Sequence, residues 1–227
     1  MDEFAAWVPF AAALAAFLGS HAIPARPPVR QRLVATLGKP AYLALYSAIS
    51  ILLLACLIQT AGSAPFVELW PFEPWQRHLP ALFVPLGFAL ATVGLFSPNP
   101  LSLSASRRSF DPARPGILAL TRHPVLLGFA FWAGAHLVPN GDLAHVLLFG
   151  TFLALAVGGM WILDKRARRR LGEGEWGRLA GRYRWLSWPG RTPWIEARLL
   201  ALGLTGIALA ALAARFHEFI AGVPAFP

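Results

Sequence analysis

Six long apolar segments restrict this chain to a protein that crosses a lipid bilayer several times. About 20 helical residues cross the hydrocarbon core of a membrane, and the segments at 4–19, 41–61, 79–96, 124–138, 143–163 and 197–216 reach or approach that length. With 56% hydrophobic and only 14% charged residues, the composition is that of an integral membrane protein. We therefore predict a single domain over residues 1–227, an all-α, polytopic membrane bundle of about six transmembrane helices.

The basic residues predict the orientation of this bundle, because cytoplasmic loops next to spanning helices are enriched in Lys and Arg. Of the 20 Lys and Arg residues, 18 follow the first, third or fifth segment, which leaves Arg77 and Arg215 on the other side. Both termini are then expected outside. The basic, aromatic-rich stretch 164–197 is expected to lie on the cytoplasmic surface as an amphipathic segment, and the proline- and arginine-rich stretch 22–33 as an interfacial loop. This distribution accounts for nearly all of the net charge of +9, so no nucleic-acid partner is needed.

The run TRHPVLLGFAFWAGAHLVPNGD, residues 121–142, concentrates ionisable groups around a short apolar segment. Ionisable side chains at membrane depth are rare and indicate function by default. Pro124 favours a helix start and Asn140-Gly141 a turn, so the run predicts one short helix with His123 and His136 at its two ends. These histidines are roughly 20 Å apart along such a helix and cannot bind one metal ion together.

A second imidazole is expected at the depth of His123, because His21 ends the first apolar segment on the same side. Two imidazoles on different helices at one depth are what axial ligation of a haem requires. Arg122, together with Arg107, Arg108 and Arg114 of the preceding loop, would then pair with the haem propionates. The simpler alternatives are that His21 is only a solvated interfacial residue and that the loop arginines only enforce topology.

At the other end of the short helix the sequence predicts a structural turn. Asp142 is suited to cap the fifth segment and to orient either His136 or His145. A metal site at this outer turn is the weaker alternative. The chain has one cysteine and therefore lacks the CxxCH motif of c-type haem attachment.

The motifs together resemble one family. The resemblance rests on Thr121-Arg122-His123-Pro124, Gly128, Trp132, Ala135-His136-Leu137 and Asn140-Gly141-Asp142, with His21, Pro24, Arg30, Leu33, Leu37-Gly38 and the run from Tyr42 to Ser47 near the N-terminus. This pattern resembles the NnrU family of bacterial membrane proteins, which is related to the haem-dependent plant 15-cis-zeta-carotene isomerase and was associated with denitrification. The resemblance implies an inner-membrane protein with periplasmic termini and a haem b site at His21 and His123. The resemblance does not establish a substrate. If the protein is an enzyme, we expect an isomerase or a redox-linked enzyme in which His21 and His123 are the catalytic residues and an apolar, polyene-like substrate enters from the lipid bilayer.

Two other functions remain open. Membrane methyltransferases that act on isoprenylcysteine or phospholipids also carry an RHP motif and a later acidic, aromatic-rich segment, which together enclose S-adenosylmethionine. Arg122-His123-Pro124, Gly128, Glu173, Glu175 and Tyr183 resemble that pattern, although Leu126 and Gly174 depart from it. The third function is a non-enzymatic haem-binding or denitrification-associated assembly protein, which the same ligands would serve.

Overall fold

The computed structural model describes residues 3–24, 26–187 and 196–225. The regular structure in these ranges is helical. Its elements are α1 (Glu3–Ala22), α2 (Pro27–Leu37), α3 (Lys39–Gly62), the 3-10 turn η1 (Pro74–Arg77), α4 (His78–Phe96), the 3-10 turn η2 (Gly116–Ala119), α5 (Pro124–Leu137), α6 (Leu143–Leu171), α7 (Glu173–Arg182), α8 (Ala197–Arg215) and α9 (His217–Ala221).

The predicted membrane bundle is confirmed. Five helical stretches are long and apolar enough to cross a membrane, namely α1, α3, η1 with α4, α6 and α8, and α5 is a shorter apolar helix. Each of the six apolar segments therefore became one helix. The stretch 22–33 is not simply a loop, because α2 begins within it, with Pro27 and Pro28 in the first turn where their missing N–H groups have no intrahelical partner. Helix α6 also continues past the apolar segment to Leu171.

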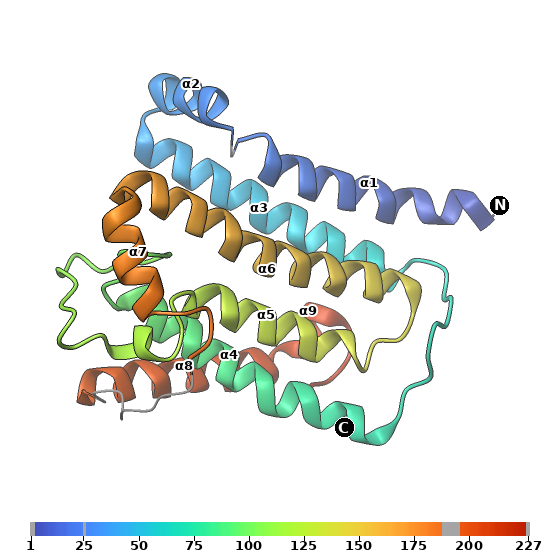
Figure 1. The fold of residues 1–227 in the computed structure, drawn as a ribbon. Coiled ribbons are helices and arrows are strands. Elements are labelled where there is room, and N and C mark those ends of the chain that lie inside the picture. The colour runs from blue at the N-terminus through green and yellow to red at the C-terminus, as the bar shows by residue number, and fades with distance from the viewer. Residues whose placement is uncertain (1–2, 25, 188–195, 226–227) are drawn as a thin grey trace.

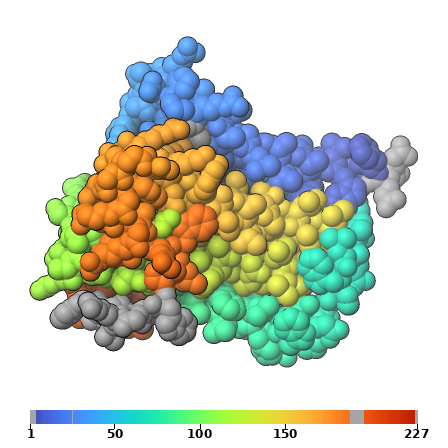
Figure 2. All heavy atoms as spheres, viewed as in Figure 1, coloured from blue at the N-terminus to red at the C-terminus, as the bar shows by residue number. Residues whose placement is uncertain are grey.

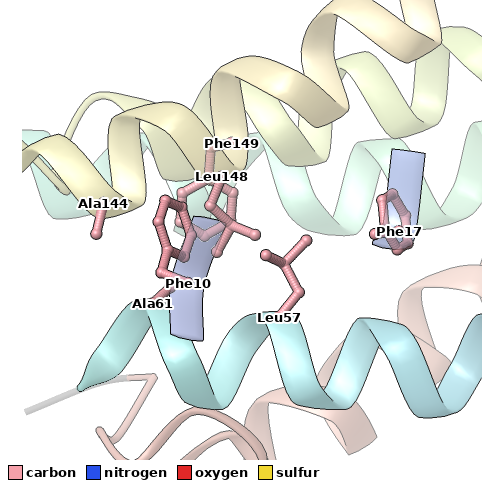
Figure 3. Close-up of a cluster of buried hydrophobic side chains, with 7 residues drawn as sticks. All are labelled: Phe10, Phe17, Leu57, Ala61, Ala144, Leu148 and Phe149. Carbon is pink, nitrogen blue, oxygen red and sulfur yellow. The ribbon is translucent and has the colours of Figure 1, made fainter. Parts of the chain in front are cut away.

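The helices lie in layers, with α1 beside α3 at the top of Figure 1, α6 next, then α5, and α4 with α8 below. One apolar cluster joins the first three of these helices: Phe10 and Phe17 of α1 meet Leu57 and Ala61 of α3 and Ala144, Leu148 and Phe149 of α6 (Figure 3). Burial of these side chains fixes α1 against the centre of the bundle.

Small residues bring α4 and α5 close together. A Cβ atom on Gly87 would lie 2.6 Å from the Gly128 carbonyl oxygen, and a Cβ atom on Gly128 would collide with the Gly87 carbonyl oxygen. Glycine at both positions therefore allows the two backbones to touch, as is common between helices in membranes. This contact fixes the position of α5 in the bundle.

We call the side of the bundle on which α7 lies the basic end. Helices α1, α4 and α6 end there and α5 and α8 begin there, while α1 begins and α8 ends on the opposite side (Figure 1). The described residues of the three basic stretches that the sequence assigns to one side do lie at one end. That this end faces the cytoplasm stays a prediction.

Candidate functional site

The centre of the basic end is a buried ion cluster around Asp164 of α6. Arg122 binds its carboxylate with two parallel hydrogen bonds, Nε to Oδ1 at 3.0 Å and Nη2 to Oδ2 at 2.5 Å. His123 Nε2 lies 2.9 Å from Oδ1, and Trp185 Nε1 donates to Oδ2 at 2.7 Å. The Asp164 side chain is only 12% exposed. Four donors converging on one carboxylate stabilise its charged form at a depth where an unpaired charge would be costly.

The residues before α5 also bind the tail that follows α7. Thr121 Oγ1 donates to the Trp185 carbonyl oxygen at 2.5 Å, and the Arg122 N–H donates to the Arg184 carbonyl oxygen at 3.0 Å. Arg122 Nη1 donates to the Tyr183 carbonyl oxygen at 3.0 Å, and its guanidinium lies 5.5 Å from the centre of the Trp176 ring. In Figure 2 the orange atoms of α7 lie against the green atoms of the preceding loops at this end. The cluster thus joins α5, α6 and α7.

His123 uses both of its ring nitrogens inside this cluster. Its side chain is fully buried, and Nδ1 lies 2.9 Å from Ser102 Oγ while Nε2 faces Asp164. Burial lowers the pKa of His123, against the opposing effect of Asp164. A neutral imidazole in this place donates from Nε2 to the carboxylate and accepts at Nδ1 from the serine hydroxyl. The lone pair of Nδ1 is then used in the hydrogen bond from Ser102 and is not available to a metal ion.

His21 is arranged differently, near the C-terminal end of α1. Its Nδ1 lies 2.8 Å from the Phe17 carbonyl oxygen, one turn earlier, and must donate the hydrogen bond. Nε2 then carries the lone pair, and it has no hydrogen-bond partner among the described residues. The rings of Phe17 and Tyr46 lie 4.3 and 5.9 Å from the imidazole by ring centres. The half-buried His21 therefore presents a free nitrogen in aromatic surroundings.

The structure does not bring His21 and His123 together. Phe152 of α6 contacts both Phe17 of α1 and Trp132 of α5, at 5.5 and 5.6 Å between ring centres. Figure 1 shows α6 between α1 and α5, the helices that carry or follow the candidate ligands. Both ring nitrogens of His123 are used in hydrogen bonds, and ligation of one haem by both histidines stays a prediction.

The candidate propionate partners are divided between two places. Arg122 is bound to Asp164, whereas Arg108 and Arg114 line a separate cavity together with Arg198 of α8. Arg107 is exposed and does not line that cavity. Neither His21 nor His123 lines it either, so these loop arginines do not surround a candidate haem ligand.

At the opposite end the predicted cap is confirmed. Asp142 accepts the backbone N–H of His145 at 3.2 Å and lies 2.8 Å from its Nδ1, so it orients His145 rather than His136. The His136 ring stacks between Phe149 and His217, at 5.1 and 6.2 Å between ring centres. Within the described ranges no three His, Cys, Asp or Glu side chains are grouped so that they could hold a metal ion.

The two glutamates of the methyltransferase resemblance face outward. Glu173 pairs with Arg168 at 2.7 Å and Glu175 with Arg178 at 2.7 Å, and both glutamates are exposed. These arginines lower the pKa of each carboxyl group. The acid that does meet Arg122 and His123 is Asp164, a role that the sequence did not predict. The available signal was its position directly after the apolar segment 143–163 and directly before a run of basic residues.

Fold and site together define a multi-pass helical membrane protein with a buried Arg–His–Asp cluster at its basic end. The family model described as NnrU protein matches residues 9–225, nearly the whole chain, and the chain therefore belongs to the NnrU family. No curated protein and no solved structure matches it.

Proposed function

We propose that this protein binds haem b in the membrane and that His21 supplies an axial ligand. The observation that carries the proposal is the orientation of the His21 imidazole, whose Nδ1–H is held by the Phe17 carbonyl oxygen at 2.8 Å. Histidines that ligate metals almost always donate their other ring N–H in this way, which fixes the tautomer and directs the lone pair outward. The neighbouring Phe17 and Tyr46 rings supply apolar surroundings suited to a porphyrin.

His123 is assigned a different role from the one that the sequence suggested. Its bonds to Ser102 and Asp164, both 2.9 Å, hold the start of α5 against α6 and the loop after α4. To ligate iron, the fully buried His123 would first have to give up one of these bonds. It is therefore a positioning residue in this proposal, and the second axial position is left to another group.

Bound haem would supply a Lewis-acid or one-electron centre close to lipid. The substrate that the family resemblance suggests is an apolar, polyene-like molecule, and isomerisation of such a molecule is the enzymatic form of the proposal. A haem-binding assembly protein is its non-enzymatic form. In both forms the protein lies in the inner membrane with periplasmic termini, as the basic end predicts. Turnover of a polyene by the haem-loaded protein would distinguish the enzymatic form from the non-enzymatic form.

The test is absorption spectroscopy of protein purified from cells supplied with haem. The wild type should show a Soret band, and His21→Ala should lose most of it. His78→Ala is the matched control, because His78 is an exposed histidine at the other end of the bundle and should leave the spectrum unchanged.

The variant His123→Asn distinguishes haem ligation by His21 without His123 from ligation by both histidines. With His21 as the protein's axial ligand, this variant should retain the wild-type band and spin state even though its stability falls. A change from a low-spin to a high-spin spectrum would instead restore the paired ligation that the sequence suggested. A wild type without a Soret band would end the haem proposal.

One observation favours the methyltransferase as a second candidate. Arg122 of the RHP motif contacts the segment after α7 through the Tyr183 carbonyl oxygen at 3.0 Å, so the two motifs of that resemblance do meet. Against this, Glu173 and Glu175 point to solvent and pair with arginines. Saturable binding of S-adenosylmethionine to the purified protein that Arg122→Gln abolishes, with no haem bound, would favour this alternative.

A further inference from the structure

A cavity at the basic end lies where the polar headgroups of a bilayer are expected. It is formed between the loop after α4, the η2 turn and the start of α8, and its volume is about 160 Å³. Both α4 and α8 are candidate membrane spans, and the cavity lies where one ends and the other begins. Exposed apolar side chains adjoin it on these helices, Phe96 and Leu200 among them. Its mouth is thus at the boundary between apolar and polar surfaces.

Three guanidinium groups give this cavity an affinity for an anion. Arg108, Arg114 and Arg198 line it, and none of the three forms an ion pair with a carboxylate in the described parts of the chain. Arg198 is anchored by a hydrogen bond of 2.9 Å to the Phe96 carbonyl oxygen, which holds one guanidinium beside the end of α4. Guanidinium groups bind phosphate oxygens with paired hydrogen bonds.

A buried hydroxyl group independently indicates a ligand. Ser97 lines the cavity with only 4% of its surface exposed, and its Oγ has no hydrogen-bond partner among the described residues. Buried hydroxyls are nearly always hydrogen-bonded, because a lost partner leaves the full desolvation penalty. A phosphate oxygen in the cavity would provide the missing partner.

Two carboxylates in the same lining decide the class of ligand. Asp111 and Glu196 line the cavity beside the three arginines. A headgroup with a phosphate alone would meet repulsion from them, whereas one that also carries a primary ammonium group would pair with both signs of charge. We propose that this cavity binds the headgroup of phosphatidylethanolamine, with the phosphate at Arg108, Arg114 and Ser97 and the ammonium group at Asp111 and Glu196. The cavity would bind this lipid with or without haem at His21.

The experiment measures binding of short-chain phospholipids to delipidated protein in detergent. Dihexanoyl phosphatidylethanolamine should bind saturably, and phosphatidylcholine, whose quaternary ammonium has no N–H to donate, should bind at least about tenfold more weakly. Phosphatidylglycerol binding as tightly as phosphatidylethanolamine would overturn the assignment of the two carboxylates. Inorganic phosphate binding as tightly as the lipid would overturn the assignment to a lipid.

Variants locate the site. Arg114→Gln should weaken phosphatidylethanolamine binding about tenfold or more, whereas Arg107→Gln, which changes an exposed arginine outside the cavity lining, should not. Ser97→Ala should also weaken binding while leaving the melting temperature of the delipidated protein equal or higher, because it removes a buried hydroxyl without a partner. Equal lipid affinity in wild type, Arg114→Gln and Ser97→Ala would refute the proposal.

Discussion

Asp164→Asn tests the cluster at the basic end, because one carboxylate there receives four donors. The amide keeps the size of the side chain but removes its charge, and it places an NH₂ group against either Arg122 Nη2 and Trp185 Nε1 or Arg122 Nε and His123 Nε2. Donors then face donors, and the Arg122 guanidinium remains buried without a counter-ion. Breaking a buried ion pair in this way costs about 3–5 kcal/mol.

The exposure of the two side chains favours the lower part of this range of destabilisation energies. The side chains of Arg122 and Asp164 are each 12% exposed, so water screens part of the remaining charge. We therefore expect a loss of about 3 kcal/mol. At about 2–4 °C per kcal/mol for a chain of this size, the melting temperature should fall by roughly 6–12 °C.

The assay is a thermal melt of purified protein in one detergent at one scan rate, with Glu173→Gln as the control. Glu173 also pairs with an arginine, but the pair is 56% and 74% exposed, so its loss should produce no measurable shift. The double variant Arg122→Gln with Asp164→Asn should be less destabilised than the sum of the single variants, since the two side chains interact directly. Equal melting temperatures for Asp164→Asn and Glu173→Gln would refute the reasoning.

Three further changes have definite expected outcomes. Burial lowers the pKa of His123, so the unfolded chain takes up a proton first as the pH falls below about 6.5, and the wild type should lose stability there. Melting curves between pH 7.5 and 5.5 should show a smaller loss in His123→Asn, and equal losses would contradict the assignment. Gly128→Ala should strongly destabilise folding, because the added Cβ would collide with the Gly87 carbonyl oxygen. Gly134→Ala on the same helix should fold, because a Cβ there meets no atom within 4 Å. Expression and size-exclusion profiles compare the two variants. Reporter fusions at Arg169 and Gly222 should report opposite sides of the membrane, as the positive-inside pattern predicts.

The membrane architecture could be predicted from the sequence because it depends on local composition. A segment such as 143–163 is apolar over its whole length, and no tertiary contact is needed to make it a spanning helix. The cap at Asp142 is equally local, since its carboxylate accepts from an N–H three residues later. In contrast, the sequence predicts a loop where α2 lies, because prolines indicate a loop unless they occupy the first helical turn, as Pro27 and Pro28 do.

The site was less predictable because its contacts join residues far apart in the chain. The partner of His123 is Asp164, 41 positions later, and a run of basic residues follows that acid in the sequence. The sequence predicts the depth of His21 and His123 along the membrane normal, whereas the lateral arrangement of α1, α5 and α6 depends on contacts between distant segments, such as those of Phe152. Similarly, Arg198 joins Arg108 and Arg114 only because α8 packs against α4, which the sequence does not show.

The claim that His21 ligates haem is tested most directly by adding imidazole to a variant that lacks this side chain. His21→Gly removes the imidazole but leaves space beside Phe17 and Tyr46, so added imidazole can occupy the position of the lost side chain. The haem spectrum of His21→Gly should be lost or altered, and imidazole at millimolar concentration should restore the wild-type band position, while the His78→Gly spectrum should not respond. A His21→Gly protein with the wild-type spectrum before imidazole is added would contradict His21 as the haem ligand.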